Sequence, residues 1–370
     1  KMLKNKKKVQ NFFKFVGYKL FKILYGEIKA KIFPKLDTDI TVNTIKLQNH
    51  SYKIFFCKKS SLYTDRVHDT AIIKNNKIIE GPSFQYRENI NVDCKSNIVL
   101  TKGTPRIKKN IKGTVFSLLT GGGGNSNYFH WLFDVLPRLF ILQNADINNL
   151  KIDYYLFPSL NKKFQKETLD ILGISSYQRL SSENTRHFFS DQIIVTSHPY
   201  NLLNDPNLDS LDIPTWIFVF LRKKFLNKSI GNKNSSKHYP KKIYINRKDA
   251  TVKSLRYIIN EDEVEENLKK RGYTSITLSD YSFSDQINLF NNSEHIIGLH
   301  GAGFSNIIFC NSNTKILELR PDTAGDAIKN LAAKNNLFYE DISSKTKNLN
   351  YNNNYGDIEV NIDLLIKKLI

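Results

Sequence analysis

From residue 241 onward, strand-length apolar segments alternate with amphipathic segments of helical length. The apolar segments are "KKIYINR" (241–247), "YTSITL" (273–278), "HIIGLHGAG" (295–303) and "KILELRP" (315–321). The amphipathic segments between and after them are "NEDEVEENLKKRG" (260–272), "SFSDQINLFNNS" (282–293) and "GDAIKNLAAKNN" (325–336). Strands separated by helices run parallel, because each helical crossover returns the chain to the same end of the sheet. The alternation therefore predicts a Rossmann-like domain over residues 241–370.

The region before residue 226 has a similar but less regular pattern. Short apolar runs such as "YKIFF" (52–56) and "TAIIKNNKIIEG" (70–81) indicate strands joined by turns. Farther along, "KIDYYLFP" (151–158) and "DQIIVTS" (191–197) indicate strands around a helical segment, which predicts α/β structure with a largely parallel sheet. The polar stretch "LNKSIGNKNSSKHYP" is the best candidate for a linker. We therefore divide the chain into a basic N-terminal segment (1–36), an N-terminal Rossmann-like domain (37–225), the linker (226–240) and a C-terminal domain (241–370).

The chain is strongly basic, with 55 Lys+Arg against 35 Asp+Glu and a net charge of +20. This balance favours an anionic partner: a nucleic acid, an acidic lipid or a phosphorylated ligand. A nucleic acid is disfavoured because the sequence has no recognised binding motif. Three distant cysteines, Cys57, Cys94 and Cys310, match neither a disulfide framework nor a zinc pattern, which predicts a reducing compartment and no structural metal. We expect a cytoplasmic protein, because the sequence has neither a membrane-spanning apolar run nor a signal-peptide cleavage site.

The first 36 residues contain eleven lysines and a single acidic residue, Glu27. Apolar residues recur there at helical spacing and lysines interrupt them, which predicts a basic amphipathic helix. These apolar residues are Phe12, Phe13, Val16, Leu20, Ile23, Leu24 and Ile28. Two interpretations remain open. The helix either lies peripherally at an anionic membrane surface, on the inner face of the cell membrane, or packs on its own domain with a solvated lysine face.

A glycine turn follows the strand of "SEHIIGLHGAGFSNIIF" (293–309). His300 ends the strand, and small residues follow at Gly301, Ala302 and Gly303. Such a turn lets backbone amides approach a phosphate or pyrophosphate, and the histidine can donate to a phosphate oxygen. The stretch matches neither the dinucleotide fingerprint nor a Walker loop. Asn306 is a candidate for a further polar contact with the donor, and Glu318 is a candidate for accepting hydrogen bonds from a ribose.

Two arginines lie upstream of this turn. Arg247 comes just past a strand, and Arg256 comes just before a helix. Either guanidinium can hold a diphosphate through bidentate hydrogen bonds. The alternative is that both arginines pair with Glu261 or Asp262 at the surface.

The stretch "GGGGNSNYFHWLFDVLPRLFIL" (121–142) combines a glycine loop with a polar stripe on a helix. In the loop, Gly123 and Gly124 let the backbone wrap closely around a substrate. At helical spacing, one face presents Asn127, His130, Asp134 and Arg138. Pro137 predicts a kink or an early stop near Asp134. His130 and Asp134 form a workable acid/base pair, in which either residue can be the base; the alternative is a buried pair that braces the domain.

Taken together, these motifs resemble glycosyltransferase family 61. The resemblance covers roughly residues 115–325 and depends on the ordered set "NYFHWLFDVLPRL" (127–139), "INR" (245–247), "RYIINEDEV" (256–264), "LHGAGFSNIIF" (299–309) and "LELRP" (317–321). It implies that donor-binding residues fall on His300, Gly301, Ala302, Gly303, Arg247 and Glu318, and that Asn127, His130 and Asp134 face the acceptor. The chain departs from the family pattern at Asn246, Phe304 and Ser305, where we expect Ser, Leu and Thr.

The resemblance further implies a GT-B architecture, in which two Rossmann-like domains face each other across a cleft. The implied reaction is an inverting hexosyl or pentosyl transfer from a nucleotide sugar, for which we expect a UDP-sugar, without a metal ion or other cofactor. The acceptor is expected to be a glycan or lipid-linked glycan in capsular or cell-surface polysaccharide synthesis. The rival interpretations are a non-catalytic glycan-binding protein and a basic nucleic-acid-binding protein on the same fold.

Overall fold

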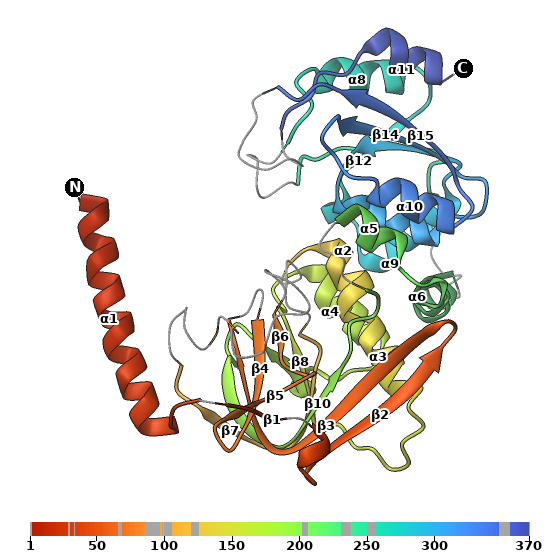
Figure 1. The fold of residues 1–370 in the computed structure, drawn as a ribbon. Coiled ribbons are helices and arrows are strands. Elements are labelled where there is room, and N and C mark those ends of the chain that lie inside the picture. Colours follow the sequence, from red (N-terminus) through yellow and green to blue (C-terminus); the bar gives the residue numbers. More distant parts are fainter. Residues whose placement is uncertain are drawn as a thin grey trace. The chain divides into compact units, whose positions relative to one another are not determined.

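The computed structural model describes residues 2–28, 30–32, 34–65, 69–85, 97, 99, 106–119, 126–201, 206–230, 238–249, 256–347 and 356–369. The chain forms two compact units (Figure 1). Unit 1 consists of Lys1–Gln165 and Gly173–Leu202, and unit 2 consists of Lys166–Leu172 and Leu203–Ile370. The chain thus enters unit 2 upstream of the polar stretch 226–240 in which the sequence predicted a linker. Gly123, Gly124 and Cys94 lie outside the described residues.

Unit 1 contains a mixed sheet, in which ten strands pair over the residues that the structure describes. They are β1 (Ala30–Ile32), β2 (Ile40–Leu47), β3 (His50–Thr64), β4 (Asp69–Lys74), β5 (Lys77–Ile79), β6 (Phe84–Gln85), β7 (Lys109–Ser117), β8 (Tyr154–Phe157), β9 (Arg179–Ser181) and β10 (His187–Thr196). The order is β1-β5-β4-β3-β10-β7-β8-β9, with β2 on β3 and β6 on β4.

Only part of the unit 1 sheet is parallel, which differs from the largely parallel sheet that the sequence predicted. The pairs β10–β7, β7–β8 and β8–β9 are parallel, whereas β3 is antiparallel to β2, β4 and β10. β2 and β3, and likewise β4 and β5, are separated by two residues, so tight turns rather than helices connect each pair. Asn75 and Asn76 join β4 to β5 with φ of 47° and 57°, a left-handed conformation that asparagine tolerates.

Unit 1 contains one long N-terminal helix, and most of its short helices follow the parallel strands. The helical elements are α1 (Met2–Tyr25), η1 (Pro34–Leu36), α2 (Tyr128–His130), the π-helical turn η5 (Trp131–Val135), α3 (Pro137–Gln143), α4 (Lys163–Ile171), which continues into unit 2, and η6 (Ser176–Gln178). Trp131, Phe133 and Leu136 are fully buried, so the segment after β7 packs its apolar side chains into the core. In the described part of the chain, no helix has the length and apolar character needed to cross a membrane.

Unit 2 contains a sheet of five described strands, and every neighbouring pair is parallel. The strands are β11 (Lys242–Ile245), β12 (Thr274–Ile276), β13 (His295–Leu299), β14 (Lys315–Pro321) and β15 (Phe338–Ser344). The order is β12-β11-β13-β14-β15, so the chain moves outward in one direction to β12 and then in the opposite direction from β13. This doubly wound arrangement confirms the predicted α/β class.

Helices cover both faces of the unit 2 sheet (Figure 1). The helical elements are α5 (Pro206–Leu211), α6 (Thr215–Leu221), the π-helical turn η7 (Arg222–Leu226), α7 (Asn227–Ile230), α8 (Glu261–Lys269), η8 (Leu278–Asp280), α9 (Phe283–Asn292), η9 (Ala302–Phe309), α10 (Ala327–Lys334) and α11 (Ile362–Lys368). Val264 and Leu268 of α8 and Leu365 of α11 pack with Tyr244 and Ile297 in one core cluster. α8 has the acidic first turn and basic last turn that the sequence predicted, which suits the helix dipole.

A buried histidine lies at the start of β10 in unit 1. The His187 ring lies 4.9 Å from the Tyr63 ring and 5.2 Å from both the Phe21 and Tyr25 rings, measured between centroids. Its Nδ1 lies 3.0 Å from the carbonyl oxygen of Arg106. Burial in this aromatic cluster lowers the pKa of His187 to about 4. The folded state therefore holds this ring in its neutral form.

The depressed pKa of His187 predicts a loss of stability as the pH falls. An unfolded chain protonates this histidine near its ordinary pKa of 6.5, whereas the folded chain does so near 4, so the free energy of unfolding decreases between these values. By pH 5 the loss from this residue is about 2 kcal/mol. Chemical denaturation of wild-type protein and His187→Gln at pH 7.5 and pH 5 measures it. The variant is expected to be less stable at pH 7.5 but less sensitive to pH; an unchanged pH dependence would contradict this assignment.

Candidate active site

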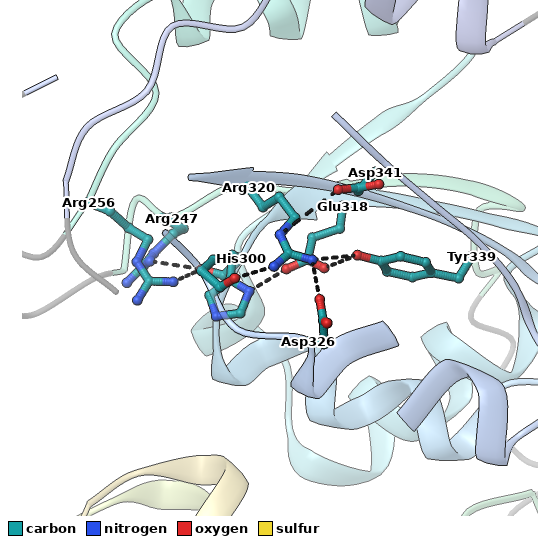
Figure 2. A network of polar contacts seen from close by, with 9 residues as sticks. Arg247, Arg256, His300, Glu318, Arg320, Asp326, Tyr339 and Asp341 are labelled. Carbon is teal, nitrogen blue, oxygen red and sulfur yellow. Dashed lines mark hydrogen bonds and ion pairs between the residues drawn. The ribbon is translucent and has the colours of Figure 1, made fainter. Parts of the chain in front are cut away.

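The polar residues of unit 2 gather where the strand order reverses. In open parallel sheets, ligands bind beyond the carboxyl ends of the strands at such a reversal, which here falls between β11 and β13. Arg247 lies two residues past β11, and His300 directly follows β13. Nη1 of Arg256 donates to the carbonyl oxygen of His300 at 2.7 Å, and Nη1 of Arg247 approaches the same oxygen at 3.4 Å (Figure 2). The structure therefore brings both predicted arginines to the predicted turn.

These contacts differ from the surface pairing with Glu261 or Asp262 that was the alternative interpretation. Glu261 instead accepts a hydrogen bond from Tyr244 Oη at 2.9 Å. Arg256 is buried and Arg247 is half-buried. Burial lowers the pKa of the Arg247 guanidinium, and the nearby carboxylates of Asp249 and Glu261 oppose this effect. A guanidinium remains charged at neutral pH, so the turn carries concentrated positive charge.

The glycines allow close approach of the backbone at this edge. A Cβ atom added to Gly298 would lie 3.1 Å from Cβ and 3.2 Å from the carbonyl oxygen of Ile245, so β11 and β13 pass each other tightly there. A Cβ atom at Gly301 would lie 3.6 Å from Nη1 of Arg247. The 3₁₀ helix η9 then begins at Ala302, and Phe304 N donates to Gly301 O at 3.1 Å. The first amides of a helix have no acceptor within it and are suited to an anion.

A buried carboxylate holds the imidazole of His300. Nδ1 of His300 is hydrogen-bonded to Oε1 of Glu318, and Tyr339 Oη donates to Oε2 of Glu318 at 2.6 Å (Figure 2). Glu318 is fully buried. Burial, together with the charge of Glu318, raises the pKa of the Tyr339 hydroxyl, which keeps it protonated as a donor. Both oxygens of Glu318 thus have partners within unit 2, and this geometry favours orienting His300 over the ribose contact that the sequence suggested.

The side chain of Asn306 was expected to contact the donor, but in the structure it bonds within unit 2. Its side chain is fully buried, and Nδ2 donates to Oε1 of Gln286 on α9 at 3.0 Å. Its neighbour Ser305 is buried as well. Asn306 therefore fixes η9 against α9 from the inside.

The polar segment of unit 1 is divided by a π-helical turn. Asn127 caps α2, because its side-chain oxygen accepts a hydrogen bond from Phe129 N at 2.9 Å. Leu136 N donates to Trp131 O at 3.1 Å, a bond to the fifth preceding residue that marks the wide turn. Pro137 explains why the π-helical turn lies here, since proline has no N–H and the proline ring displaces the carbonyl four residues earlier. The predicted disturbance near Asp134 is therefore present.

Asp134 lies at the centre of a buried cluster. Its Oδ2 lies 2.7 Å from Nδ1 of His130 and 3.8 Å from Nε2 of His198, while Tyr200 Oη donates to Oδ1 at 2.5 Å. Burial by itself raises the pKa of the Asp134 carboxyl, but His130 and His198 outweigh it and hold the pKa well below its usual range. Asp134 is thus a carboxylate at neutral pH. Because a carboxylate only accepts hydrogen bonds, Nδ1 of His130 is the donor, which leaves Nε2 of a neutral ring as a hydrogen-bond acceptor.

Arg138 braces this cluster. It is almost completely buried, its Nε donates to the carbonyl oxygen of Asp134 at 3.3 Å, and its Nη1 donates to the carbonyl oxygen of Thr196 at 3.0 Å. Burial lowers the pKa of Arg138 to about 10, which leaves the side chain protonated at neutral pH. The predicted stripe therefore separates into a cap, a histidine–aspartate pair and a buried brace that ties this helix to the end of β10.

Sequence reasoning missed three residues of these two clusters, namely His198, Tyr200 and Tyr339. The first two belong to "SHPY" (197–200), which directly follows β10. Since β10 is parallel to β7, residues that follow the two strands meet at one sheet edge. The position of "SHPY" directly after an apolar strand was a signal that could have identified His198 and Tyr200. The sequence contains no such signal for Tyr339, because its contact with Glu318 depends on the pairing of β15 with β14.

No group of three or more His, Cys, Asp or Glu residues with the arrangement of a metal site occurs among the residues that the structure describes. The side chains of the two clusters offer cationic, imidazole and carboxylate chemistry. The first cluster, at the glycine turn of unit 2, is suited to holding an anion. The second cluster, around Asp134, is suited to moving a proton.

Tyr200→Phe tests the support of Asp134. The substitution keeps the aromatic ring and removes a hydrogen bond to a buried carboxylate, so we expect a loss of about 1.5–3 kcal/mol in the free energy of unfolding. Urea denaturation at neutral pH measures this loss. Tyr177→Phe is the matched control, because Tyr177 is exposed in the same unit. Equal stability of the two variants would show that the bond to Asp134 contributes nothing.

The comparison with known proteins agrees with these motifs. A search of curated protein sequences finds no match. The sequence model of the family described as Glycosyltransferase 61 matches residues 128–317, a little more than half of the chain. This span begins at Tyr128, the first residue of α2, and it includes His130, Asp134, His198, both arginines, the glycine turn and the start of β14. The chain therefore belongs to the Glycosyltransferase 61 family.

Proposed function

We propose that this glycosyltransferase moves a sugar from a UDP-sugar to a hydroxyl group of a glycan or lipid-linked glycan, with inversion at the anomeric carbon and without a metal ion. Membership of the family supports a nucleotide-sugar donor and a glycan acceptor in general. The observation that carries the finer proposal is the convergence of Arg247 and Arg256 on the carbonyl oxygen of His300 at the reversal of the sheet.

The cluster of unit 2 binds the diphosphate of the donor in this proposal. Two guanidiniums and the amides at the start of η9 provide positive charge where the leaving group becomes more negative during transfer. The hydrogen bond between Nδ1 of His300 and Glu318 fixes the direction of the His300 ring beside this positive charge. These residues take the part that a divalent cation plays in metal-dependent transferases.

His130 is the base in this proposal, and Asp134 orients it. The acceptor hydroxyl loses its proton to Nε2 of His130 while its oxygen forms a bond to the anomeric carbon. The bond from that carbon to the phosphate oxygen breaks at the same time, and its electron pair leaves with the nucleoside diphosphate. Asp134 is a poor base because its pKa is held well below the usual range. Its hydrogen bond at 2.7 Å instead fixes the tautomer and the direction of the ring.

The proposal includes the GT-B architecture, in which acceptor and donor residues come from different domains. It also includes a cytoplasmic location and a part in capsular or cell-surface polysaccharide synthesis. The two described cysteines are free thiols, which supports a reducing compartment. Cys57 and Cys310 are both buried, and burial raises the pKa of Cys57 to about 12, so it is a structural rather than a reactive thiol.

Donor binding is tested by Arg247→Ala and His300→Ala. Each variant removes one charge-assisted contact with the diphosphate, so we expect about 10- to 100-fold weaker UDP binding by calorimetry. Arg271→Ala is the matched control: it removes the same charge from the same unit, and its Nη1 contacts Asn267 O at the end of α8. UDP affinity that is equal in Arg247→Ala, His300→Ala and the control would exclude this cluster as the donor site.

The base is tested by His130→Ala. Loss of a general base is expected to lower kcat for transfer by about 10²- to 10⁴-fold while UDP affinity stays within error. The assay offers a panel of UDP-sugars, and NMR of the product reports the anomeric configuration. His238→Ala, which removes an exposed histidine, is the control with full activity. Full activity in His130→Ala would remove this helix from the chemistry, and retention of configuration would refute the inverting mechanism.

A further inference from the structure

Helix α1 has two apolar faces, and only one of them packs on the other described residues of unit 1. The Phe21 ring lies 5.5 Å from the Tyr63 ring and 5.2 Å from the His187 ring, measured between centroids. Tyr25 Oη accepts a hydrogen bond from Lys108 N at 2.9 Å. These contacts anchor the C-terminal end of α1. The contacts are made by one face of the helix, on which Phe21 and Tyr25 lie because they are four residues apart in sequence.

The second apolar face is exposed. Its members are 55% to 78% exposed and comprise Val9, Phe12, Phe13, Leu20, Ile23 and Leu24. At 100° per residue they fall within an arc of roughly 120°, centred well away from Phe21 and Tyr25. A helix that only packed on its own unit would direct its largest apolar side chains inward. We therefore infer that a partner other than the described residues of this chain covers the exposed face of α1.

The charge of α1 identifies the chemistry of that occupant. The helix contains seven lysines and no acidic residue. On the helix, Lys8 and Lys19 border the exposed apolar face on one side, and Lys6 borders it on the other. Lysine stems can pack along apolar surface while their ammonium groups reach a polar layer. An apolar face bordered by lysines matches the interface of an anionic bilayer, with acyl chains under the phenylalanines and phosphates beside the lysines.

We propose that α1 docks this protein on an anionic lipid surface, with its exposed apolar face buried in the headgroup boundary. A nucleic acid would be matched by the lysines but not by the aliphatic and aromatic side chains between them. A second copy of α1 would cover the apolar face but would bring two sets of seven lysines together. Docking of this kind does not require the transfer reaction, so the docking proposal and the proposed function are tested independently.

Vesicle co-sedimentation of the full chain tests the docking. Wild-type protein is expected to sediment with vesicles of phosphatidylglycerol and phosphatidylcholine, and not with vesicles of phosphatidylcholine alone. Raising the ionic strength is expected to weaken the binding, because salt screens the lysines. Phe12→Glu and Phe13→Glu are each expected to weaken partitioning at least about ten-fold, since each removes the burial of a phenylalanine. Exchange of Lys6, Lys8 and Lys19 for Gln is expected to weaken it by about five-fold per residue.

The matched control is Tyr177→Glu, which replaces an aromatic residue of unit 1 that is 78% exposed but belongs to η6 instead of α1. This variant is expected to bind the anionic vesicles like wild type. Equal binding of Phe12→Glu, Phe13→Glu and Tyr177→Glu would overturn the proposal, and so would equal binding to neutral and anionic vesicles. If the wild-type protein forms a dimer without lipid and Phe12→Glu dissociates this dimer, the face binds a second copy of the chain instead. Preferential, salt-sensitive binding of DNA over anionic vesicles would assign it to nucleic acid.

Phe13→Trp provides a direct readout of insertion. The two native tryptophans, Trp131 and Trp216, are buried, so the new indole is the solvent-exposed one. Its emission is expected to shift to shorter wavelength on addition of phosphatidylglycerol vesicles, because the ring leaves water. An unshifted spectrum in protein that has sedimented with the vesicles would refute insertion of this face.

Discussion

The reversal of strand order between β11 and β13 is the constraint on which the candidate donor site depends. Crossovers from these two strands leave in opposite directions, so the carboxyl ends of the strands remain open at that point. Gly298 lets β13 approach β11 closely, and the carbonyl oxygen of His300 follows directly after this strand. Two guanidiniums come together there because each donates to that oxygen. The backbone topology thus places two positive charges side by side at this edge of the sheet, and no single side chain does so alone.

The two units use the same local device at their candidate sites. In unit 2, His300 bonds through Nδ1 to buried Glu318, whose other oxygen accepts from Tyr339. In unit 1, His130 bonds through Nδ1 to buried Asp134, whose other oxygen accepts from Tyr200. Burial of a carboxylate is costly unless its oxygens are hydrogen-bonded, and here a tyrosine and a histidine satisfy them. The low local dielectric then strengthens each bond and fixes the ring.

The sequence located the elements that carry these residues more reliably than it predicted the burial of the residues themselves. The strand that ends in His300, the glycine turn, and the kink at Pro137 follow from local rules of backbone conformation, so short stretches revealed them. Glu318, Asn306 and Arg138 were expected to meet ligands, but each is buried and bonded inside its own unit. An exposed and a buried polar residue look alike in a sequence, because burial depends on what packs over the residue.

What the sequence determined by itself is local: the lengths and types of the elements in unit 2, the polarity of α8, and the amphipathic character of α1. These properties depend on residues within a few turns or a single strand. Tertiary structure alone decided that β10 lies beside β7, so that "SHPY" meets the helix of His130, and that β15 lies beside β14, so that Tyr339 reaches Glu318. Strand order and register result from packing between segments far apart in the chain, and the periodicity of one segment carries no information about its neighbour.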